Sequence, residues 1–376
     1  MVEWKKLGEV GTFENIGTDK KIVEGEDIVT LLNYVDVYHH KYIDSSVPQM
    51  QVSASSKKIA DCTVEKGDIF VTPSSETVDD IGHSSVITET ISNAVYSYHI
   101  MRYRLFEKNM LLSYYINYSF DTDNVKRQIL KKAQGLTRFG LSKDKFASIL
   151  IPIPSLEEQT RIVGILDTFT SAIDNLKEQI AQRRKQYEYY RDQLLDLEGK
   201  PGVEMKTLPE ISDNRDRVRK PITSSKRKAG NYPYYGASGI VDYVDGYIFD
   251  GDYLLISEDG ANLVARSTPI AFSITGKNWV NNHAHVLQFK DKATQKYVEI
   301  YLNMIDLEPW INGAAQPKLN QDNLNKISIP LPPLSEQQRI VSILDTFEAS
   351  IQNLEAQLKE REKQYEYYRN KLLTFE

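Results

Sequence analysis

Two stretches of the chain carry hydrophobic residues at alternating intervals of four and three, and they are copies of each other. Residues 155–198 and 333–376 are identical at 26 of 44 aligned positions. An internal repeat has to be recognised before single elements are assigned. The intervals predict a long coiled-coil helix in each copy. The seam positions are Ile162, Leu166, Phe169, Ile173, Leu176, Ile180, Tyr187, Tyr190, Leu194 and Leu197, and in the second copy Ile340, Leu344, Phe347, Ile351, Leu354, Leu358, Tyr365, Tyr368, Leu372 and Phe375.

Each predicted helix is about 60 Å long at 1.5 Å per residue. Ser155 with Glu158, and Ser335 with Gln338, have the spacing of a capping box at the start of each helix. Two unrelated helices in solvent are the alternative. We favour a pair, because two matched seams in one chain have each other as the nearest partner.

The direction of the pair is indicated by two arginines. Arg183 and Arg361 occupy the position in each copy where the next apolar residue of the seam is due. A parallel pair would bring the two guanidinium groups into one layer, where like charges repel and lose hydration. An antiparallel pair separates them, so we expect antiparallel packing. A parallel pair in which both arginines extend outward to water is the alternative.

The segments before the two helices have the pattern of α/β globular domains. In the first half, β-rich runs at 69–72 and 85–88 lie between turn signals such as Lys66-Gly67-Asp68, and residues 111–120 have the composition of a packed helix. Residues 149–154, with two prolines, lead into the first helix as an extended segment. Gly199-Lys200-Pro201-Gly202 marks the boundary after that helix.

The second half then restarts in the same order. Residues 203–208 resemble residues 2–7, and Gly251-Asp252 resembles Gly67-Asp68. Residues 315–319 (Ala-Gln-Pro-Lys-Leu) resemble residues 133–136 (Ala-Gln-Gly-Leu), and 327–332 repeat the extended lead-in. We therefore predict an α+β protein made by tandem duplication, with pseudo-twofold symmetry: a domain at 1–154, a helix at 155–198, a second domain at 199–332 and a second helix at 333–376.

Composition narrows the class of protein. The chain has 376 residues, of which 41% are hydrophobic, and a single cysteine, Cys62. A lone cysteine excludes a disulfide framework and is typical of a reducing compartment. Neither a signal peptide nor an apolar run of membrane-spanning length occurs. We expect a cytoplasmic protein with no membrane partner.

Charge is distributed unevenly. The net charge of the chain is -6, which by itself argues against binding to nucleic acid. Both helical repeats are acidic, however, so the rest of the chain is nearly neutral and contains basic clusters. The densest cluster, at 215–228, has hydroxyl residues between its cations, and an aromatic and serine-containing stretch follows it. This combination suits phosphate contacts beside a base-reading surface. A charged, solvated loop is the alternative.

The predicted backbone-contacting and flanking residues of the second half are Arg215, Arg217, Arg219, Lys220, Lys226, Arg227, Lys228, Tyr234, Tyr235 and Ser238. A second basic run precedes the first helix, and from it we select Lys131, Lys132 and Arg138. Polar side chains in loops are the candidates for reading bases. They are Lys57, Lys58, Ser74, Ser75, Thr77, Tyr98 and His99 in the first half, and Asn262, Arg266, Lys277, Asn278, Asn281, Asn282 and His283 in the second.

Motifs for catalysis are missing from the sequence. It contains no G-x-x-x-x-G-K-[ST] loop, no G-x-S-x-G elbow and no paired C-x-x-C. His283 and His285 would lie on one face of a strand and could hold a metal, but no acidic or cysteine partner is near them in sequence. Ordinary strand or loop histidines explain them better. We predict no catalytic residue, no metal and no bound cofactor.

The arrangement resembles the specificity subunit of type I restriction–modification systems. The most specific motifs are the paired segments 151–162 (IPIPSLEEQTRI) and 329–340 (IPLPPLSEQQRI), each of which opens a long helix. Residues 233–239 (PYYGASG) and 315–319 (AQPKL) are similar to signatures of the family's target-recognition domains, and the second signature implies that Gln316 and Lys318 contact DNA.

This resemblance implies that each globular domain recognises one half of a bipartite site in double-stranded DNA. The helices would then be antiparallel, fix the spacer and dock modification subunits. Adenine methylation with S-adenosylmethionine belongs to those subunits, and ATP- and Mg-dependent translocation and cleavage belong to restriction subunits. The chain itself would be non-catalytic.

A second apolar face near the start of each helix consists of Val163, Ile165, Val341 and Ile343. We expect it to dock a partner subunit, and packing against the chain's own domains is the equal alternative. Two other functions stay open. One is a stand-alone DNA-binding or assembly scaffold without enzyme partners, and the other is an enzyme whose site is unlike the motifs searched.

Overall fold

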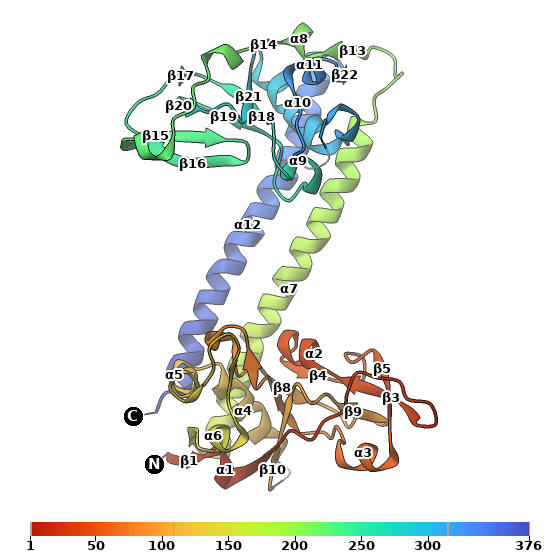
Figure 1. Cartoon of the computed structure of the whole chain (residues 1–376), viewed down its shortest axis with the longest axis vertical. Helices are drawn as coiled ribbons and strands as arrows, with labels where there is room; N and C mark the ends of the chain where they lie inside the picture. Colours follow the sequence, from red (N-terminus) through yellow and green to blue (C-terminus); the bar gives the residue numbers. More distant parts are fainter. Residues whose placement is uncertain (1, 108, 314–315, 376) are drawn as a thin grey trace. The chain divides into compact units, whose positions relative to one another are not determined.

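The computed structural model of the chain describes residues 2–107, 109–313 and 316–375 (Figure 1). It divides the chain into two compact units, and each of them contains a globular part and half of each long helix. Unit 1 comprises Met1–Lys177 and Ala356–Glu376, and unit 2 comprises Glu178–Glu355. In the part of the chain so described, no helix is long and apolar enough to cross a membrane.

The two long helices are α7 (Leu156–Leu195) and α12 (Leu334–Leu373), of 40 residues each. Ser155 caps α7, because its hydroxyl accepts a hydrogen bond from the Glu158 N–H at 3.3 Å, whereas the Glu158 carboxylate, the other half of the predicted capping box, accepts from Arg161. The capping box predicted at Ser335 is wrong. Helix α12 already begins at Leu334, so Ser335 lies in its first turn and the backbone oxygen of Pro333 accepts the first hydrogen bonds, from Glu336 and Gln337.

The helices are antiparallel, as the two arginines indicated. In unit 1, Phe169 on α7 stacks on Tyr368 of α12, with ring centroids 5.4 Å apart. In unit 2, Tyr190 stacks on Phe347 at 5.3 Å, and Arg184 forms an ion pair with Glu355 at 2.5 Å. Positions later in α7 thus meet positions earlier in α12. The predicted α+β fold with an antiparallel helix pair is confirmed.

The globular part of unit 1 is built on a five-stranded sheet in the order β2-β10-β6-β8-β4. A smaller sheet, β5-β3-β9, packs beside it, and a second apolar core contains residues of both sheets, among them Leu31 and Phe70. The strands of these sheets are β2 (Gly11–Glu14), β3 (Asp27–Leu32), β4 (Tyr42–Ile43), β5 (Met50–Ala54), β6 (Ile69–Val71), β8 (Ser84–Ile87), β9 (Ala94–Tyr96) and β10 (Met101–Leu105). The remaining elements are β1 (Glu3–Lys6), α1 (Leu7–Val10), α2 (Tyr34–His39), α3 (Ser56–Asp61), β7 (Ser74–Ser75), η1 (Val78–Asp80), α4 (Met110–Phe120), α5 (Asp123–Lys132), β11 (Phe139–Gly140), α6 (Lys143–Ala147) and β12 (Leu150–Ile153).

Unit 2 repeats this plan with a four-stranded sheet, β14-β21-β18-β19, and a second sheet, β16-β15-β20-β17. Its strands are β13 (Glu204–Thr207), β14 (Ser212–Asn214), β15 (Ala229–Gly236), β16 (Gly239–Val244), β17 (Phe249–Asp250), β18 (Tyr253–Ser257), β19 (Ala271–Ile274), β20 (Lys277–Val280), β21 (Ala284–Phe289) and β22 (Ser328–Leu331). Its short helices are α8 (Leu208–Ile211), η2 (Asp216–Val218), η3 (Ser224–Lys226), α9 (Asn262–Ala265), α10 (Lys292–Met304), η4 (Glu308–Trp310) and α11 (Gln321–Leu324).

The main core of each unit includes side chains from both long helices. Ile162, Leu166 and Leu373 are buried in the core of unit 1. Ile340, Leu344 and Leu195 are buried in the core of unit 2, and they are the same residue types at the repeated positions. Each sheet therefore packs on one end of the helix pair through an equivalent set of side chains.

The extended segments before the long helices are edges of two-stranded ribbons. Strand β1 pairs with β12, with Trp4 opposite Pro152, and β13 pairs with β22, with Met205 opposite Pro330. A buried tyrosine joins each ribbon to a neighbouring helix, α4 in unit 1 and α10 in unit 2. Tyr115 donates to the backbone oxygen of Pro152 at 2.9 Å, and Tyr297 to that of Pro330 at 2.6 Å.

The hairpins before β12 and β22 correct one part of the sequence alignment. The N–H groups of Gln134 and Asn312 donate to Gly140 and Lys318, and these two residues donate back. Gln134 is thus equivalent to Asn312, and Gly135 to Gly313, at the offset of 178 that also relates the helices. The predicted match of Ala133-Gln134 to Ala315-Gln316 is wrong by four residues, and Ala315 itself lies outside the described residues. Gln316 corresponds to Arg138.

Candidate nucleic-acid interface

Four segments of unit 2 meet at one end of its main sheet. The turn between β15 and β16 is held by Ser257, whose hydroxyl donates to the Ala237 oxygen at 2.5 Å. The loop after β18 is joined to the segment before β21 by the hydrogen bond from Glu258 N–H to His283 O, at 2.9 Å. It is joined to the segment before α11 by the bond from Leu319 N–H to Glu258 O, at 2.8 Å. We call these four segments the unit 2 edge.

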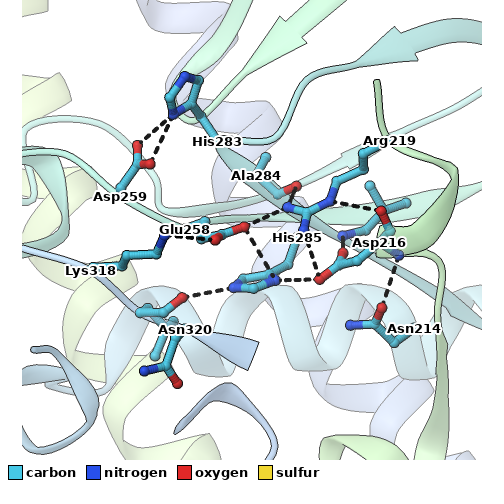
Figure 2. Close-up of polar contacts among 12 residues, drawn as sticks. Asn214, Asp216, Arg219, Glu258, Asp259, His283, Ala284, His285, Lys318 and Asn320 are labelled. Atoms are coloured by element: carbon cyan, nitrogen blue, oxygen red, sulfur yellow. Dashed lines mark hydrogen bonds and ion pairs between the residues drawn. The ribbon is translucent and has the colours of Figure 1, made fainter. Parts of the chain in front are cut away.

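A buried group of charged side chains lies beneath this edge (Figure 2). The guanidinium of Arg219 lies 2.6 Å from Glu258 and 3.3 Å from Asp216, and it donates to the Ala284 oxygen at 2.7 Å. Nδ1 of His285 lies 2.6 Å from Asp216, and its Nε2 lies 2.8 Å from the Leu319 oxygen. The group therefore ties the basic loop (residues 215–228), β18, β21 and the segment before α11 together.

The electrostatics of the group favour ionised carboxylates. Burial alone would raise the pKa of Asp216, but hydrogen bonds from His285 and Val286 and the charge of Arg219 hold that pKa below its usual value. Burial also opposes ionisation of Glu258, and its contacts with Arg219, His285 and Lys318 likewise lower its pKa. Removal of one cation would leave a buried negative charge without compensation.

Polar side chains continue from this group to the surface. Lys318 lies 3.3 Å from the second oxygen of Glu258, and His283 lies 2.8 Å from Asp259 (Figure 2). The Asn281 oxygen accepts a hydrogen bond from the His283 N–H at 2.8 Å. The side chains of Ser238, Asn282, His283, Gln316 and Lys318 are exposed. The edge therefore offers both donors and acceptors, which reading of base edges requires.

The two histidines that suggested a metal are both occupied by partners within the chain. His285 is bonded through both ring nitrogens, and His283 is bonded to Asp259. The sequence does not single out Glu258 and Asp259, because their side-chain partners lie 24 to 60 residues away along the chain. The turn signal at Asp259-Gly260 was the only local indication.

Several predicted contact residues of unit 2 also have partners within the chain. Arg227 stacks on the buried Tyr234 at 4.5 Å and pairs with Asp242 at 3.2 Å. Arg266 donates to the oxygens of Leu302 and Ile305, at 3.3 and 2.8 Å. The remaining residues of this kind are Asn262, bonded to Thr268; the buried Asn278, bonded to Gly276; Lys277, over the ring of Tyr247; and Tyr235, beside Phe272.

The basic loop keeps an outward set of cations. Arg215 is exposed, with Asp213 at 3.6 Å and a hydrogen bond to Gln288 at 3.0 Å. The other exposed cations of the loop are Arg217, Lys220, Lys226 and Lys228. Because Arg219 anchors the loop from beneath, these side chains are presented on a fixed backbone beside the unit 2 edge.

Unit 1 has an edge at the equivalent place with different chemistry. The Leu141 N–H donates to the Pro73 oxygen at 2.9 Å, and β7 pairs with β11. Arg138 donates to the Ser74 hydroxyl at 3.2 Å. We call the loop after β6, the hairpin at 134–140 and the turn at Tyr98-His99 the unit 1 edge. Here hydroxyl and aromatic groups take the place of the Lys318 and His283 ion pairs.

An aromatic cluster that the sequence did not reveal lies at this edge. Asp80 accepts hydrogen bonds from Tyr38, Ser75 and His83, at 3.0, 3.2 and 2.9 Å. The ring of Tyr38 lies 4.3 Å from that of His83. The hydrogen bond to Asp80 and its charge raise the pKa of Tyr38, so Tyr38 remains a donor at neutral pH. Only the turn at Ile81-Gly82 marked this region in the sequence.

The remaining predicted residues of unit 1 divide into two groups. Tyr98 is exposed and stacks on His99 at 4.0 Å, and burial together with the charges of Lys20 and Arg138 lowers the pKa of His99. Lys57, Thr77 and Lys131 are exposed. By contrast, Lys58 donates to the Ile16 and Gly17 oxygens, and Lys132 donates to Ser148, so both tie loops together.

The predicted docking residues of the helices also differ in their surroundings. Val163 is buried in the core of unit 1, and Val341 packs against the core of unit 2. Ile165 is half-buried and lines an open groove on the helix pair. The other residues of that groove are Arg161, Phe169, Arg361, Gln364, Tyr368 and Leu372. Ile343 is the half-buried counterpart of Ile165 in unit 2.

These features define a class of protein: two globular domains of the same plan, each packed on the same pair of long helices, with different polar side chains at their edges. Residues 1–183 and 201–362 match the family described as "Type I restriction modification DNA specificity domain". The match covers most of the chain, and the protein belongs to this family. The resemblance inferred from the sequence is confirmed.

Individual relatives agree with this assignment. A putative type I restriction enzyme specificity subunit of Haemophilus influenzae is 42% identical over 188 residues, which are 48% of this chain and 48% of that protein. The EcoR124I/EcoR124II specificity subunit of Escherichia coli is 32% identical over 261 residues, 60% of this chain and 63% of that protein. The match thus spans 48% of the length of the first of these relatives and 63% of the second.

The fold is also found in a solved structure. The crystal structure of a type I restriction–modification S subunit from M. genitalium has a TM-score of 0.61 against this chain. The likeness covers 100% of this chain and 97% of that one, at 15% sequence identity. At this identity it demonstrates a common fold.

Proposed function

We propose that the chain is the non-catalytic subunit that selects the DNA sequence in a type I restriction–modification complex. Each unit reads one half of a bipartite target in double-stranded DNA through its edge. The helix pair sets the spacer and binds modification subunits. By family resemblance, those subunits use S-adenosylmethionine to methylate adenine, and restriction subunits use ATP and Mg.

The observation that supports this proposal is that the two units share their supporting elements but differ in the polar side chains of their edges. The ribbons, the hairpins and the helix positions are repeated, whereas the unit 1 edge is aromatic and hydroxyl-rich and the unit 2 edge carries paired cations and amides. Two equal frames with unequal polar edges suit the reading of two different sequences. Exposed cations beside each edge supply the contacts to phosphates.

The docking part of the proposal rests on Ile165 and Ile343. Val163 and Val341 already pack against the chain's own cores, so we assign docking to the two half-buried isoleucines and to the groove around Ile165. Apolar groups beside arginine and tyrosine are the usual composition of the centre of a protein interface.

Methylome sequencing with and without the gene tests the proposal. We expect a split motif that disappears with the gene. Exchange of residues 203–326 for the corresponding domain of a relative is expected to change one half of the motif only. A continuous motif, or a change in both halves, would contradict the assignment. Purified chain incubated with DNA and S-adenosylmethionine should transfer no methyl group, and methyl transfer would identify an enzyme instead.

A further inference from the structure

The hairpin at 134–140 in unit 1 has a tip that is fixed to the unit 1 edge. Gln134 and Gly140 exchange two backbone hydrogen bonds, of 3.0 and 2.8 Å, which close the hairpin. Phe139 and Gly140 pair with Ser75 and Ser74, and the next residue, Leu141, is bonded to Pro73 and buried. The tip therefore cannot move far from the loop after β6.

The shape of the tip is specified by Gly135. Its φ is +147°, in the region that side-chain-bearing residues rarely adopt. A Cβ at this position would collide with the backbone oxygen of Arg138. The turn from Gly135 to Arg138 is consequently tight, and it presents the two residues between them, Leu136 and Thr137, to the outside.

Leu136 is 95% exposed, more than any other large hydrophobic side chain in the described part of the protein. The segment of sequence that carries it is cationic. The segment 124–145 contains seven lysines and arginines and one acid, Asp144. Arg138, two residues on, is exposed and bonded to Ser74 at the edge. A partner that covers this leucine must accept positive charge around it, which favours a polyanion over the apolar face of a protein.

We propose that Leu136 is a wedge that enters the base stack of the half-site bound by unit 1. DNA offers phosphates to the surrounding cations and apolar base faces to the leucine. Proteins that insert leucine or similar side chains between base pairs unstack the step, and the extra contacts offset the cost. This inference rests on the proposed function, since it requires unit 1 to bind DNA.

The second hairpin does not carry such a residue. It is closed by hydrogen bonds between Asn312 and Lys318, of 2.9 and 2.8 Å, and Gly313 repeats Gly135 with a φ of +83°. In the sequence, alanines occupy positions 314 and 315, where the first hairpin has Leu136 and Thr137. The wedge is therefore expected in one half-site only, which gives the experiment an internal control.

The test uses the full chain, in complex with its modification subunits, and duplexes that carry 2-aminopurine at successive positions of each half-site. We expect the native protein to raise the fluorescence at one step of the unit 1 half-site. Leu136→Ser should remove most of that rise and weaken binding about tenfold, whereas Leu136→Met should retain both. Because the side chain is exposed, thermal unfolding should be the same for all three proteins.

Leu130→Ser is the matched control, since Leu130 is an exposed leucine in the same basic segment. It should leave the fluorescence and the affinity unchanged. If Leu136→Ser shows the fluorescence and affinity of the native protein, Leu136 does not insert into the base stack, and the proposed function is unaffected. A native complex that binds neither half-site would overturn the proposed function itself, and the wedge with it.

Discussion

The guanidinium of Arg361 lies over the ring of Phe169, 5.8 Å from its centroid. The repeat places Arg183 over Phe347 in the same way, at 5.7 Å. Each arginine that interrupts the apolar seam thus has an aromatic face of the other helix as its partner. Each phenylalanine also stacks on a tyrosine, Tyr368 or Tyr190. The two arginines that indicated an antiparallel pair therefore make contacts that depend on the antiparallel arrangement.

Phe169→Leu should destabilise the helix pair while roughly preserving apolar volume. The substitution removes the cation–π contact and the stacked ring pair, which together contribute about 1–2 kcal/mol. Urea unfolding measures the loss, and Phe347→Leu should give a similar value in unit 2. Lys363→Ala, at an exposed position of α12, serves as the control. A loss no greater than that of the control would show that these aromatic contacts are energetically neutral.

Asp216→Asn should destabilise unit 2 at neutral pH. The substitution leaves Arg219 and His285 buried with less compensating charge, and loss of one member of a buried ion pair costs about 3 kcal/mol. The pKa of Asp216 is lower when the chain is folded than when it is unfolded. Its contribution to stability is therefore complete above the unfolded pKa, near 4, and is lost as the pH falls through the lower folded pKa.

The difference between native protein and Asp216→Asn should therefore be largest near pH 7 and shrink below pH 4. Trp4 is the only tryptophan outside unit 2. Urea unfolding in a Trp4→Phe background therefore reports unit 2 through Trp279 and Trp310. Asp213→Asn, at an exposed position nearby, is the control. An equal effect of both substitutions at pH 7 would contradict the role assigned to the buried group.

Replacement of the outward cations of the basic loop should weaken DNA binding without changing the recognised sequence. Each phosphate contact contributes about 0.9 to the slope of log K against log[salt]. The combined change of Arg217, Lys220, Lys226 and Lys228 to Gln should reduce the magnitude of this negative slope by up to about 3–4. Fluorescence anisotropy across a salt series measures it. Lys290→Gln, beyond the other end of β21, should leave the slope unaltered, and a native slope in the fourfold variant would exclude the loop from the interface.

Ile165→Asp and Ile343→Asp should reduce co-purification of the chain with a modification subunit. A charge in the centre of an apolar interface loses its hydration without gaining a partner. Thr168→Asp and Thr346→Asp are matched controls, since these exposed threonines are also repeat-related and lie on the same helices. Native yields of the complex from both isoleucine variants would remove docking from this surface.

The helix pair could be predicted because its information is local and repeated. Seam spacing, the two arginines and the proline-containing lead-ins all lie within 44-residue stretches, and the structure confirms their direction. The capping box predicted at Ser335 is wrong, since Pro333 already satisfies the first N–H groups through its backbone oxygen. The alignment predicted for the hairpins is wrong because Ala-Gln occurs in both, whereas the equivalent positions are set by backbone bonds to Pro73 and Glu258.

The edges were harder to predict because the roles of neighbouring cations are decided by distant partners. Arg217 and Arg219 are two residues apart, yet one is exposed and the other is fixed by Glu258, 39 residues further on. Arg227 and Lys228 differ in the same way through Tyr234 and Asp242. Composition can identify a basic loop, but it cannot separate the cations that support the loop from those that face outward.

The side chains that the long helices contribute to the two cores have a consequence for the exchange of domains by recombination. Ile162, Leu166 and Leu373 recur as Ile340, Leu344 and Leu195, so a reading domain transferred from one half of the gene to the other would meet the same three apolar groups. A domain transferred by crossing-over within the repeated stretch would therefore pack on helix side chains of the same kind as those it had left. If each unit reads half of the target, as proposed, half of that target would change in a single genetic event, while the scaffold would need no new mutation to fold.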